Sequence, residues 1–365
     1  MNRSLRVPAA LVAVVVCLVS WLCLSPSAVA EQKLYVLWSA GDSVSSIDVA
    51  TDRILTRIVV GQLPHGIASP ASQDVLYVTA EGDDQLTVID TRNDKVIARH
   101  AVGGRPNEID VTSDGRFIYI PALRDGRYEV FDTSTEEIVA RIPTDGFPHN
   151  AVVSPDDRWV YFSPMDLGDR DPEQIADLGL PTSLNDKIYI VDARSHEVAA
   201  TVQLADAPRP IAVHPSGDRL FVNRDGLLGF EVIDLAKRQI VATAHFEVTR
   251  EERATPSRAH GLAVTPDGRE IWATDINHAV VHVFDVSEAQ PRQIARLPTG
   301  KTPTWLTITP DGATVYVANA GDDTVSVYDV ASKSQRTEIR MPEGSAPKRM
   351  LVVDVPDGSA ATSGR

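Results

Sequence analysis

The amino-acid sequence predicts an all-β protein, a seven-bladed β-propeller with four antiparallel strands per blade, in which the C-terminal strand joins the N-terminal blade and closes the ring. Three observations support this prediction: a repeat of about 42 residues, four short strand-like segments in each repeat, and incomplete repeats at the two ends that complement each other. A repeat of this length with four strands per unit is typical of propeller blades.

The repeat is marked by a short hydrophobic segment that ends in aspartate, as in LTVIDT and VSVYDV. Successive aspartates are 42, 42, 60, 42, 51 and 44 residues apart, so the two longer spacings indicate insertions. Each aspartate falls where the third strand turns into the fourth, and we interpret its side chain as a cap on that turn rather than as a metal ligand. The seven residues are Asp48, Asp90, Asp132, Asp192, Asp234, Asp285 and Asp329.

Each repeat predicts its strands in the same order. A proline-containing junction leads into a short strand such as 150–154, and a Pro-Asp-Gly turn such as 265–269 follows. A second strand such as 75–80 precedes a polar loop, a third strand ends at the aspartate, and a fourth strand such as 95–102 completes the blade. These segments are rich in β-branched and aromatic residues, which favour strands.

The two ends of the chain together make the seventh blade. Residues 33–60 contain strands two to four without a first strand, and residues 346–358 contain a first strand and its turn. Joining them closes the ring and removes the open sheet edges that invite aggregation. The propeller is therefore expected over residues 31–358, followed by a disordered tail at 359–365.

Residues 1–30 have the features of a secretory signal peptide: basic residues, an apolar segment at 7–24 and a small-x-small end at Ala28-Val29-Ala30. Cleavage after Ala30 would place the protein in the periplasm or outside the cell without a transmembrane span; an uncleaved anchor is the alternative. Both cysteines, Cys17 and Cys23, lie in this segment, so we expect neither disulfides nor covalently attached haem. The net charge of −15 makes nucleic acid an improbable partner.

Two stretches, 75–106 and 314–344, resemble the YVTN-type β-propeller repeat, and the resemblance extends over essentially the whole chain after the signal peptide. Proteins of this kind include YncE-like exported propellers, and similar chains are labelled cytochrome d1-like or lactonase-like. The resemblance implies the propeller fold. It does not imply one function, because functional sites are grafted onto a fold.

In this strand order, the first strand of each blade lines the central channel, and the residue after the junction proline stands at the channel mouth. The turns on one face of the disc are nearly identical, whereas the residues at the mouth differ from blade to blade, which favours a ligand site there. The seven first positions are His65, Asn107, His149, Arg209, His260, Thr304 and Lys348, and the seven next positions are Gly66, Glu108, Asn150, Pro210, Gly261, Trp305 and Arg349.

Both insertions, 165–186 and 249–258, fall on the same face as the mouth. Loops above a rigid scaffold are where binding residues collect. The first insertion is long enough to lie over the channel as a lid; an ordinary surface loop is the alternative.

His65, His149 and His260 occupy equivalent positions in alternate blades, so their side chains can converge on the channel axis. Imidazole binds zinc, copper and iron, and three protein ligands with an open position are typical of a catalytic metal. The alternative is that the three histidines bind backbone carbonyls or water. Glu108 or Asn150 could hydrogen-bond to the histidine ligands and orient them.

The other residues at the mouth favour a small anionic ligand, because arginine and lysine bind carboxylates and phosphates. No HExxH, GxSxG or GxGxxG motif is present, and nothing in the sequence indicates a nucleotide cofactor. The candidate ligand-binding residues are Asn107, Glu108, Asn150, Arg209, Trp305, Lys348 and Arg349, with ordinary packing as the alternative for each.

The sequence supports two hypotheses of function. The first is a monomeric exported scaffold that binds a small anionic ligand or an extracytoplasmic protein partner at the channel mouth. The second is a metal-dependent enzyme, a lyase, lactonase-like enzyme or oxidoreductase, that uses His65, His149 and His260 on a small anionic substrate. The residues do not decide whether the protein is an enzyme.

Overall fold

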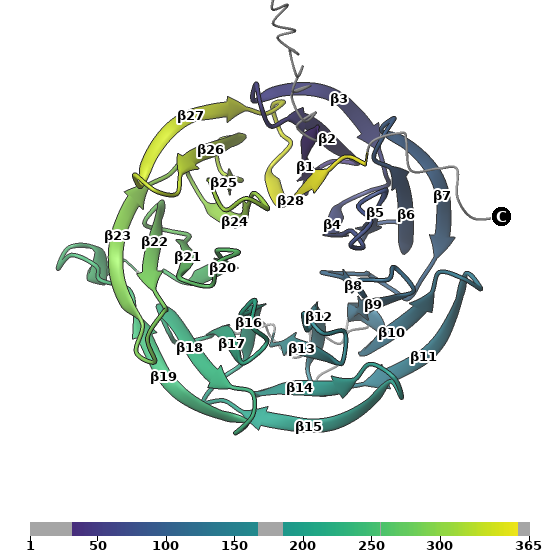
Figure 1. Cartoon of the computed structure of the whole chain (residues 1–365), viewed down its shortest axis with the longest axis horizontal. Helices are drawn as coiled ribbons and strands as arrows, with labels where there is room; N and C mark the ends of the chain where they lie inside the picture. The colour runs from purple at the N-terminus through teal and green to yellow at the C-terminus, as the bar shows by residue number, and fades with distance from the viewer. Residues whose placement is uncertain (1–30, 167–184, 256, 357–365) are drawn as a thin grey trace, which may run out of the picture.

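The computed structural model describes residues 31–166, 185–255 and 257–356, and within them it shows seven four-stranded antiparallel sheets arranged in a ring (Figure 1). The predicted seven-bladed propeller is therefore confirmed. The predicted signal peptide, the tail at 359–365 and most of the first insertion lie outside the described residues.

The first four blades use the strands at both ends of the chain and those up to residue 203. Blade one contains β28 (Pro347–Asp354), β1 (Gln32–Trp38), β2 (Ser43–Asp48) and β3 (Arg53–Val59). Blade two contains β4 (Pro64–Ala68), β5 (Val75–Ala80), β6 (Gln85–Asp90) and β7 (Lys95–Ala101). Blade three contains β8 (Asp110–Val111), β9 (Phe117–Ala122), β10 (Arg127–Asp132) and β11 (Glu137–Pro143). Blade four contains β12 (Phe147–Val153), β13 (Trp159–Met165), β14 (Lys187–Asp192) and β15 (Glu197–Gln203).

The remaining three blades follow in chain order. Blade five contains β16 (Pro208–Val213), β17 (Arg219–Arg224), β18 (Gly229–Asp234) and β19 (Gln239–His245). Blade six contains β20 (Ala259–Val264), β21 (Glu270–Asp275), β22 (Val280–Asp285) and β23 (Arg292–Pro298). Blade seven contains β24 (Pro303–Ile308), β25 (Thr314–Asn319), β26 (Thr324–Asp329) and β27 (Ser334–Arg340).

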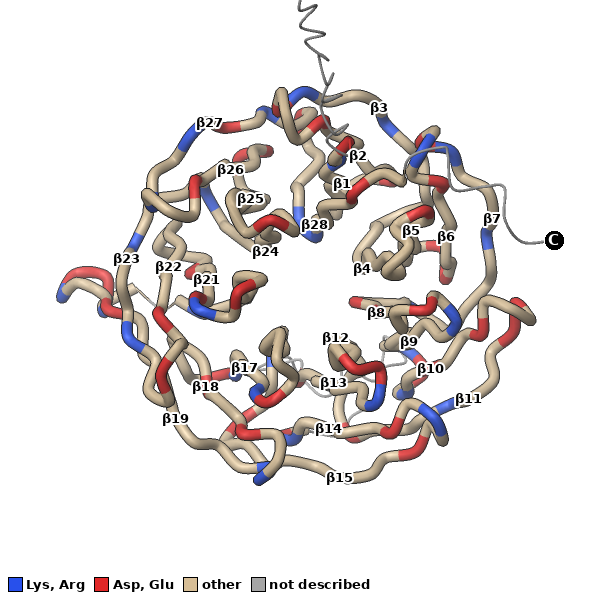
Figure 2. Tube along the Cα trace, viewed as in Figure 1, with Lys and Arg blue, Asp and Glu red and all other residues tan. Residues whose placement is uncertain are grey.

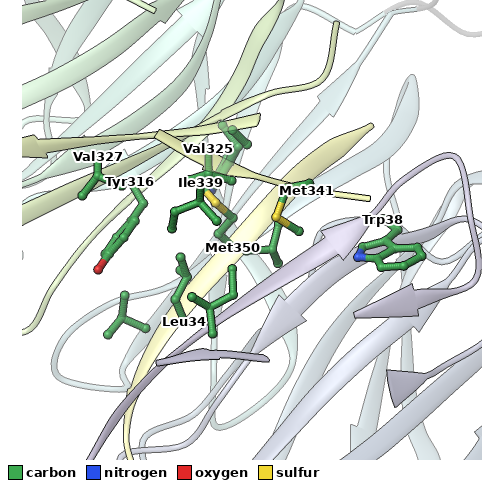
Figure 3. Packing of buried hydrophobic residues seen from close by; sticks show 13 residues of the cluster. Leu34, Trp38, Tyr316, Val325, Val327, Ile339, Met341 and Met350 are labelled. Carbon is green, nitrogen blue, oxygen red and sulfur yellow. The ribbon is translucent and has the colours of Figure 1, made fainter. Parts of the chain in front are cut away.

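Ring closure takes place in blade one, as predicted. β28 pairs antiparallel with β1, with Leu34 opposite Val352 and Gln32 opposite Asp354. The apolar side chains of blades seven and one then pack into one core, shown in Figure 3, and this burial joins the two ends of the chain. The labelled members of that core are Leu34, Trp38, Tyr316, Val325, Val327, Ile339, Met341 and Met350.

The seven repeat aspartates cap their own turns, as interpreted from the sequence. Each accepts a backbone N–H from a residue two or three positions further on, at 2.7–3.0 Å, as from Thr51 to Asp48 and from Ser332 to Asp329. The aspartate in each repeat is thus explained by its own backbone.

Helical structure within the described ranges is confined to two 3-10 segments, η1 (Leu123–Asp125) and η2 (Glu252–Ala254). No helix among these residues is long and apolar enough to cross a membrane. The second segment lies in the insertion that precedes β20, at the outer rim of the disc, where Glu252 forms an ion pair with Arg296 of the outer strand β23 (Figure 1).

Candidate ligand site at the channel mouth

The inner strands β28, β4, β8, β12, β16, β20 and β24 surround the channel (Figure 1), and Figure 2 shows a basic segment of β28 at its edge. A cavity of about 230 Å³ opens where these strands begin. Six of the seven first positions predicted for the mouth line it; Thr304 does not, and its hydroxyl donates to the Pro347 carbonyl. The lining residues are His65, Glu81, Arg105, Asn107, Leu123, His149, Met165, Arg209, Arg258, His260 and Lys348.

His65 lies between an acidic and a basic side chain. Its Nδ1 is 2.9 Å from Glu81 Oε1, and its Nε2 is 2.7 Å from Lys348 Nζ. A carboxylate accepts hydrogen bonds and an ammonium donates them, so we assign the imidazole proton to Nδ1 and the lone pair to Nε2. His65 therefore points a basic nitrogen at Lys348.

Glu81 is itself fixed by several donors. Asn107 Nδ2 donates to its Oε1 at 2.5 Å, and Arg105 Nη2 donates to its Oε2 at 3.0 Å. Burial alone would raise the pKa of Glu81, but His65 and Arg105 outweigh it and lower the pKa to about 2. The side chain is an anchored carboxylate at neutral pH.

Beneath the cavity, a buried ion pair crosses the channel. Glu108 is fully buried and accepts a hydrogen bond from Arg349, whose guanidinium carbon lies 3.3 Å from the centre of the Trp305 ring. Burial would raise the pKa of Glu108, but the charges of Arg349 and Lys348 outweigh burial and lower it well below its usual range. Glu108 therefore stays ionised although it has no contact with water.

One oxygen of this carboxylate has no hydrogen-bond partner. Glu108 Oε1 is buried and unpaired, and it lies 3.8 Å from His65 Nε2 and 3.9 Å from His149 Nε2. His149 is only 4% exposed and its Nδ1 is also unpaired. Burial lowers the pKa of His149 to about 3, so the imidazole is neutral at pH 7. An unpaired, buried carboxylate oxygen between two imidazoles costs free energy unless another group fills the gap.

The ligand atoms of His65, Glu108 and His149 all lie within 4.8 Å of one another, so this group could hold a metal ion. Bonds of about 2.1 Å in a tetrahedral site put ligand atoms roughly 3.4 Å apart, so the side chains need to move inward only slightly. His260, expected as the third histidine, is not in this group. Its Nδ1 lies 2.7 Å from the Thr304 carbonyl instead, and Glu108 takes the third place.

The cavity is cationic. Four of its lining side chains are basic and one is acidic, although the whole chain carries a net charge of −15. Arg209 forms a bidentate ion pair with Asp225, with N–O distances of 2.5 and 2.7 Å. The Arg258 side chain has no hydrogen bond or ion pair within the described part of the chain, and burial, with repulsion from Arg209, lowers its pKa. Its charge is available to a ligand.

Arg258 reaches the cavity because hydrogen bonds fix the second insertion, residues 249–258, to blade six. His278 places Nδ1 2.7 Å from Asp275 Oδ2 and Nε2 3.0 Å from the Glu252 carbonyl. Ser257, next to Arg258, donates to the other oxygen of Asp275. His278 therefore belongs to the support of the insertion and not to the cavity wall.

The remaining predicted ligand-binding residues lie below the cavity, where they connect blades. Asn150 Oδ1 accepts the Ile211 backbone N–H at 3.2 Å, and its Nδ2 donates to the Ala151 carbonyl at 3.4 Å. Trp305 and Arg349 stack on each other. Sequence reasoning missed Glu81, Arg105 and Arg258, and the only signal for them was their place in loops on the mouth face.

The family model "Lactonase, 7-bladed beta-propeller" matches residues 147–353, more than half of the 365 residues. The chain belongs to this lactonase family. A second model, "Cytochrome D1 heme domain", matches residues 30–164 of this lactonase-family chain. The lactonase-like and cytochrome d1-like resemblance is thereby confirmed. No curated protein matches the chain in sequence.

Solved structures with the same fold include enzymes with different reactions. The periplasmic gluconolactonase PpgL of Pseudomonas aeruginosa superposes with a TM-score of 0.70 at 17% identity, over 89% of this chain and 99% of that one. Hydrazine synthase of Kuenenia stuttgartiensis gives 0.68 at 20% identity, over 80% and 91%. The dihydro-heme d1 dehydrogenase NirN gives 0.60 at 17%, over 88% and 75%. At these identities the likeness concerns the fold alone.

Proposed function

We propose that this lactonase-family propeller binds a small anionic ligand in the cavity at the channel mouth. The observation that carries the proposal is the charge of the cavity: Arg105, Arg209, Arg258 and Lys348 face one acidic lining residue, Glu81. Cations held close together and partly removed from water repel one another, and an anion relieves that repulsion.

The size of the cavity limits the ligand. About 230 Å³ is less than the roughly 300–1,000 Å³ of pockets that bind drug-sized molecules, so a short acid fits better than a nucleotide or polymer. Arginine binds carboxylates with two parallel hydrogen bonds, and Arg258 is free to do so. One structural relative is named a gluconolactonase, so gluconate and its lactone belong in the first test panel.

The test is calorimetric titration with short carboxylates, gluconate, gluconolactone and phosphate. We expect one ligand to bind with a 1:1 ratio, and Arg258→Ala to weaken it about tenfold, which corresponds to 1.4 kcal/mol. Arg250→Ala is the matched control, because Arg250 is an exposed arginine in the same insertion. Failure of every anion to bind, or equal affinity in the two variants, contradicts the proposal.

A second candidate is a metal centre at His65, Glu108 and His149, favoured by the unpaired oxygen of Glu108 between the two imidazoles. The Glu81 carboxylate behind His65 resembles the support that metal-binding histidines receive in proteins. Two histidines and one carboxylate suit zinc, copper or iron, and a bound ion would supply Lewis-acid chemistry for a lactonase-like or other enzymatic role. Metal binding requires that Lys348 leave His65 Nε2.

Metal content after dialysis against zinc, copper or iron tests this candidate. His149→Gln should abolish binding and His260→Gln should not, if Glu108 is the third ligand. Loss of metal binding in His260→Gln as well would instead support the site made of three histidines. Absence of bound metal in the wild-type protein overturns both versions and leaves anion binding untouched.

We also propose that the chain is exported through residues 1–30 and works as a monomer in the periplasm or outside the cell, where an extracytoplasmic protein is an alternative partner. The support is the sequence of the segment, with its basic start and Ala28-Val29-Ala30 end. Sequencing of the mature N-terminus should begin at Glu31. An intact N-terminus in the cytoplasmic fraction contradicts export.

A further inference from the structure

We propose that Lys348, His65 and Glu81 form a relay in which the Lys348 amine acts as a nucleophile, so that the cavity captures carbonyl-bearing acids as a reversible imine. This inference rests on the proposed anion binding and specifies the ligand class: a short 2-oxo or aldehydic acid.

The relay is built from three adjoining elements. Lys348 comes from β28, His65 from β4, and Glu81 follows β5. Lys348 Nζ lies 2.7 Å from His65 Nε2, and His65 Nδ1 lies 2.9 Å from Glu81 Oε1. A nucleophile in contact with a base, and a base oriented by a third group, is the general arrangement of activated nucleophiles in enzymes.

Lys348 has no evident structural reason for its place. Within residues 31–166, 185–255 and 257–356 its Nζ forms no ion pair with a carboxylate, and its hydrogen-bond partner there is the imidazole of His65. A lysine amine that contacts an imidazole and has no carboxylate partner can pass a proton to that imidazole and react with a carbonyl group.

The covalent step balances without an added cofactor. After His65 Nε2 has taken a proton from the Lys348 ammonium, Nζ attacks the carbonyl carbon, a C–N bond forms, and the π electrons of the carbonyl move to its oxygen. Two protons of Nζ pass in turn through His65 Nε2 to that oxygen, which leaves as water when its bond to carbon breaks and the C=N bond forms. Amine and carbonyl thus give imine and water, while Arg258 holds the ligand's carboxylate.

A lactone would react differently, and this separates the two ligand classes. Attack of the amine on an ester carbonyl opens the ring to a stable amide, which would block the site after one event. A keto acid forms a bond that water reverses. The relay therefore favours a keto or aldehydic acid as the ligand that the cavity holds reversibly.

The experiment uses pyruvate and glyoxylate as probes, with borohydride to reduce the imine and intact-mass measurement to detect it. We expect one reduced adduct per chain, mapped by peptide sequencing to Lys348. Lys348→Arg keeps the charge and should give no adduct, while Lys301→Arg, at an exposed lysine, should label like the wild type. His65→Asn keeps the amine and should slow labelling at least tenfold, an effect that a merely structural role would not produce.

Lactate distinguishes failure of this inference from failure of the proposed anion binding, because it carries the carboxylate but has no carbonyl to form an imine. Binding of lactate and pyruvate that depends on Arg258, without an adduct, overturns the relay and leaves the anion site standing. An adduct on Lys348 that does not depend on Arg258 supports the relay and contradicts the anion site. Equal labelling of surface lysines, or of Lys348→Arg, overturns the relay.

Discussion

The two faces of the disc use polar residues in opposite ways. On the turn face, each repeat aspartate is satisfied by its own turn, as Asp329 is by Ser332. Hydrogen bonds from the turn lower the pKa of half-buried aspartates such as Asp234 and Asp329. At the mouth, partners come from different blades: Lys348 of blade one meets His65 of blade two, and Glu108 of blade three meets Arg349 of blade one.

The difference shows how a repeat protein can carry a unique site. A residue that serves its own turn is needed in every blade and therefore recurs. A residue that points into the channel meets its neighbours across the ring, so each position has a different environment and can diverge. Turn-face substitutions should act independently, whereas mouth substitutions should be coupled.

The largest effect is expected where the mouth is most tightly coupled. Glu108→Gln leaves the Arg349 guanidinium buried without its counter-charge, and loss of one partner of a buried pair costs about 3–5 kcal/mol. Chemical denaturation should show this loss. The double variant Glu108→Leu/Arg349→Met should recover most of it, and a single-variant loss below about 1 kcal/mol would contradict the coupling.

A pH effect should distinguish the mouth from the turn face. His149 has a lowered pKa, near 3, because burial disfavours its charge, whereas the unfolded chain protonates it near 6.5. Between these two pKa values the unfolded state binds more protons than the folded state. The free energy of unfolding should therefore fall by up to about 1.4 kcal/mol for each pH unit by which the pH is lowered. His149→Gln should flatten that slope in denaturation curves from pH 4 to 8. An unchanged slope contradicts a buried neutral imidazole.

His278 should show the opposite sign. Burial opposes its charge, but the Asp275 carboxylate and the Glu252 carbonyl outweigh burial and raise its pKa. The stabilisation from the His278 charge is fully present below the pKa of the unfolded chain, about 6.5. It is lost as pH rises through the pKa of His278 in the folded protein. His278→Asn should cost about 1.5–3 kcal/mol at pH 5 and less at pH 9. Anion binding through Arg258 should weaken in the same variant, and a loss that grows with pH would contradict this reasoning.

The smallest effects are expected on the turn face. Asp90→Ala and Asp329→Ala each remove side-chain hydrogen bonds within one turn, and each should cost about 1 kcal/mol. Because the two turns lie in different blades, the double variant should show the sum within about 0.5 kcal/mol. Thermal or chemical unfolding measures both. A double variant whose loss of stability differs strongly from the sum would contradict the view that turn-face substitutions act independently.

Much of the site could be placed from the sequence because the repeat fixes which residue follows each junction. That rule brought His65, Asn107, His149, Arg209, His260 and Lys348 to one cavity. It could not show which of them meet. His260 turns to the Thr304 carbonyl, and Glu108, one position further along its strand, comes within reach of two histidines.

The sequence by itself determined the number of blades, the closure by the C-terminal strand and the face that carries the insertions, because these depend on local strand patterns and turn chemistry. Only the tertiary structure decided the partners of each polar side chain at the mouth. Lys348 and His65 are 283 positions apart and meet because the ring closes between them. Contacts of that kind depend on the curvature of the whole ring and the burial it creates, which no short stretch of sequence encodes.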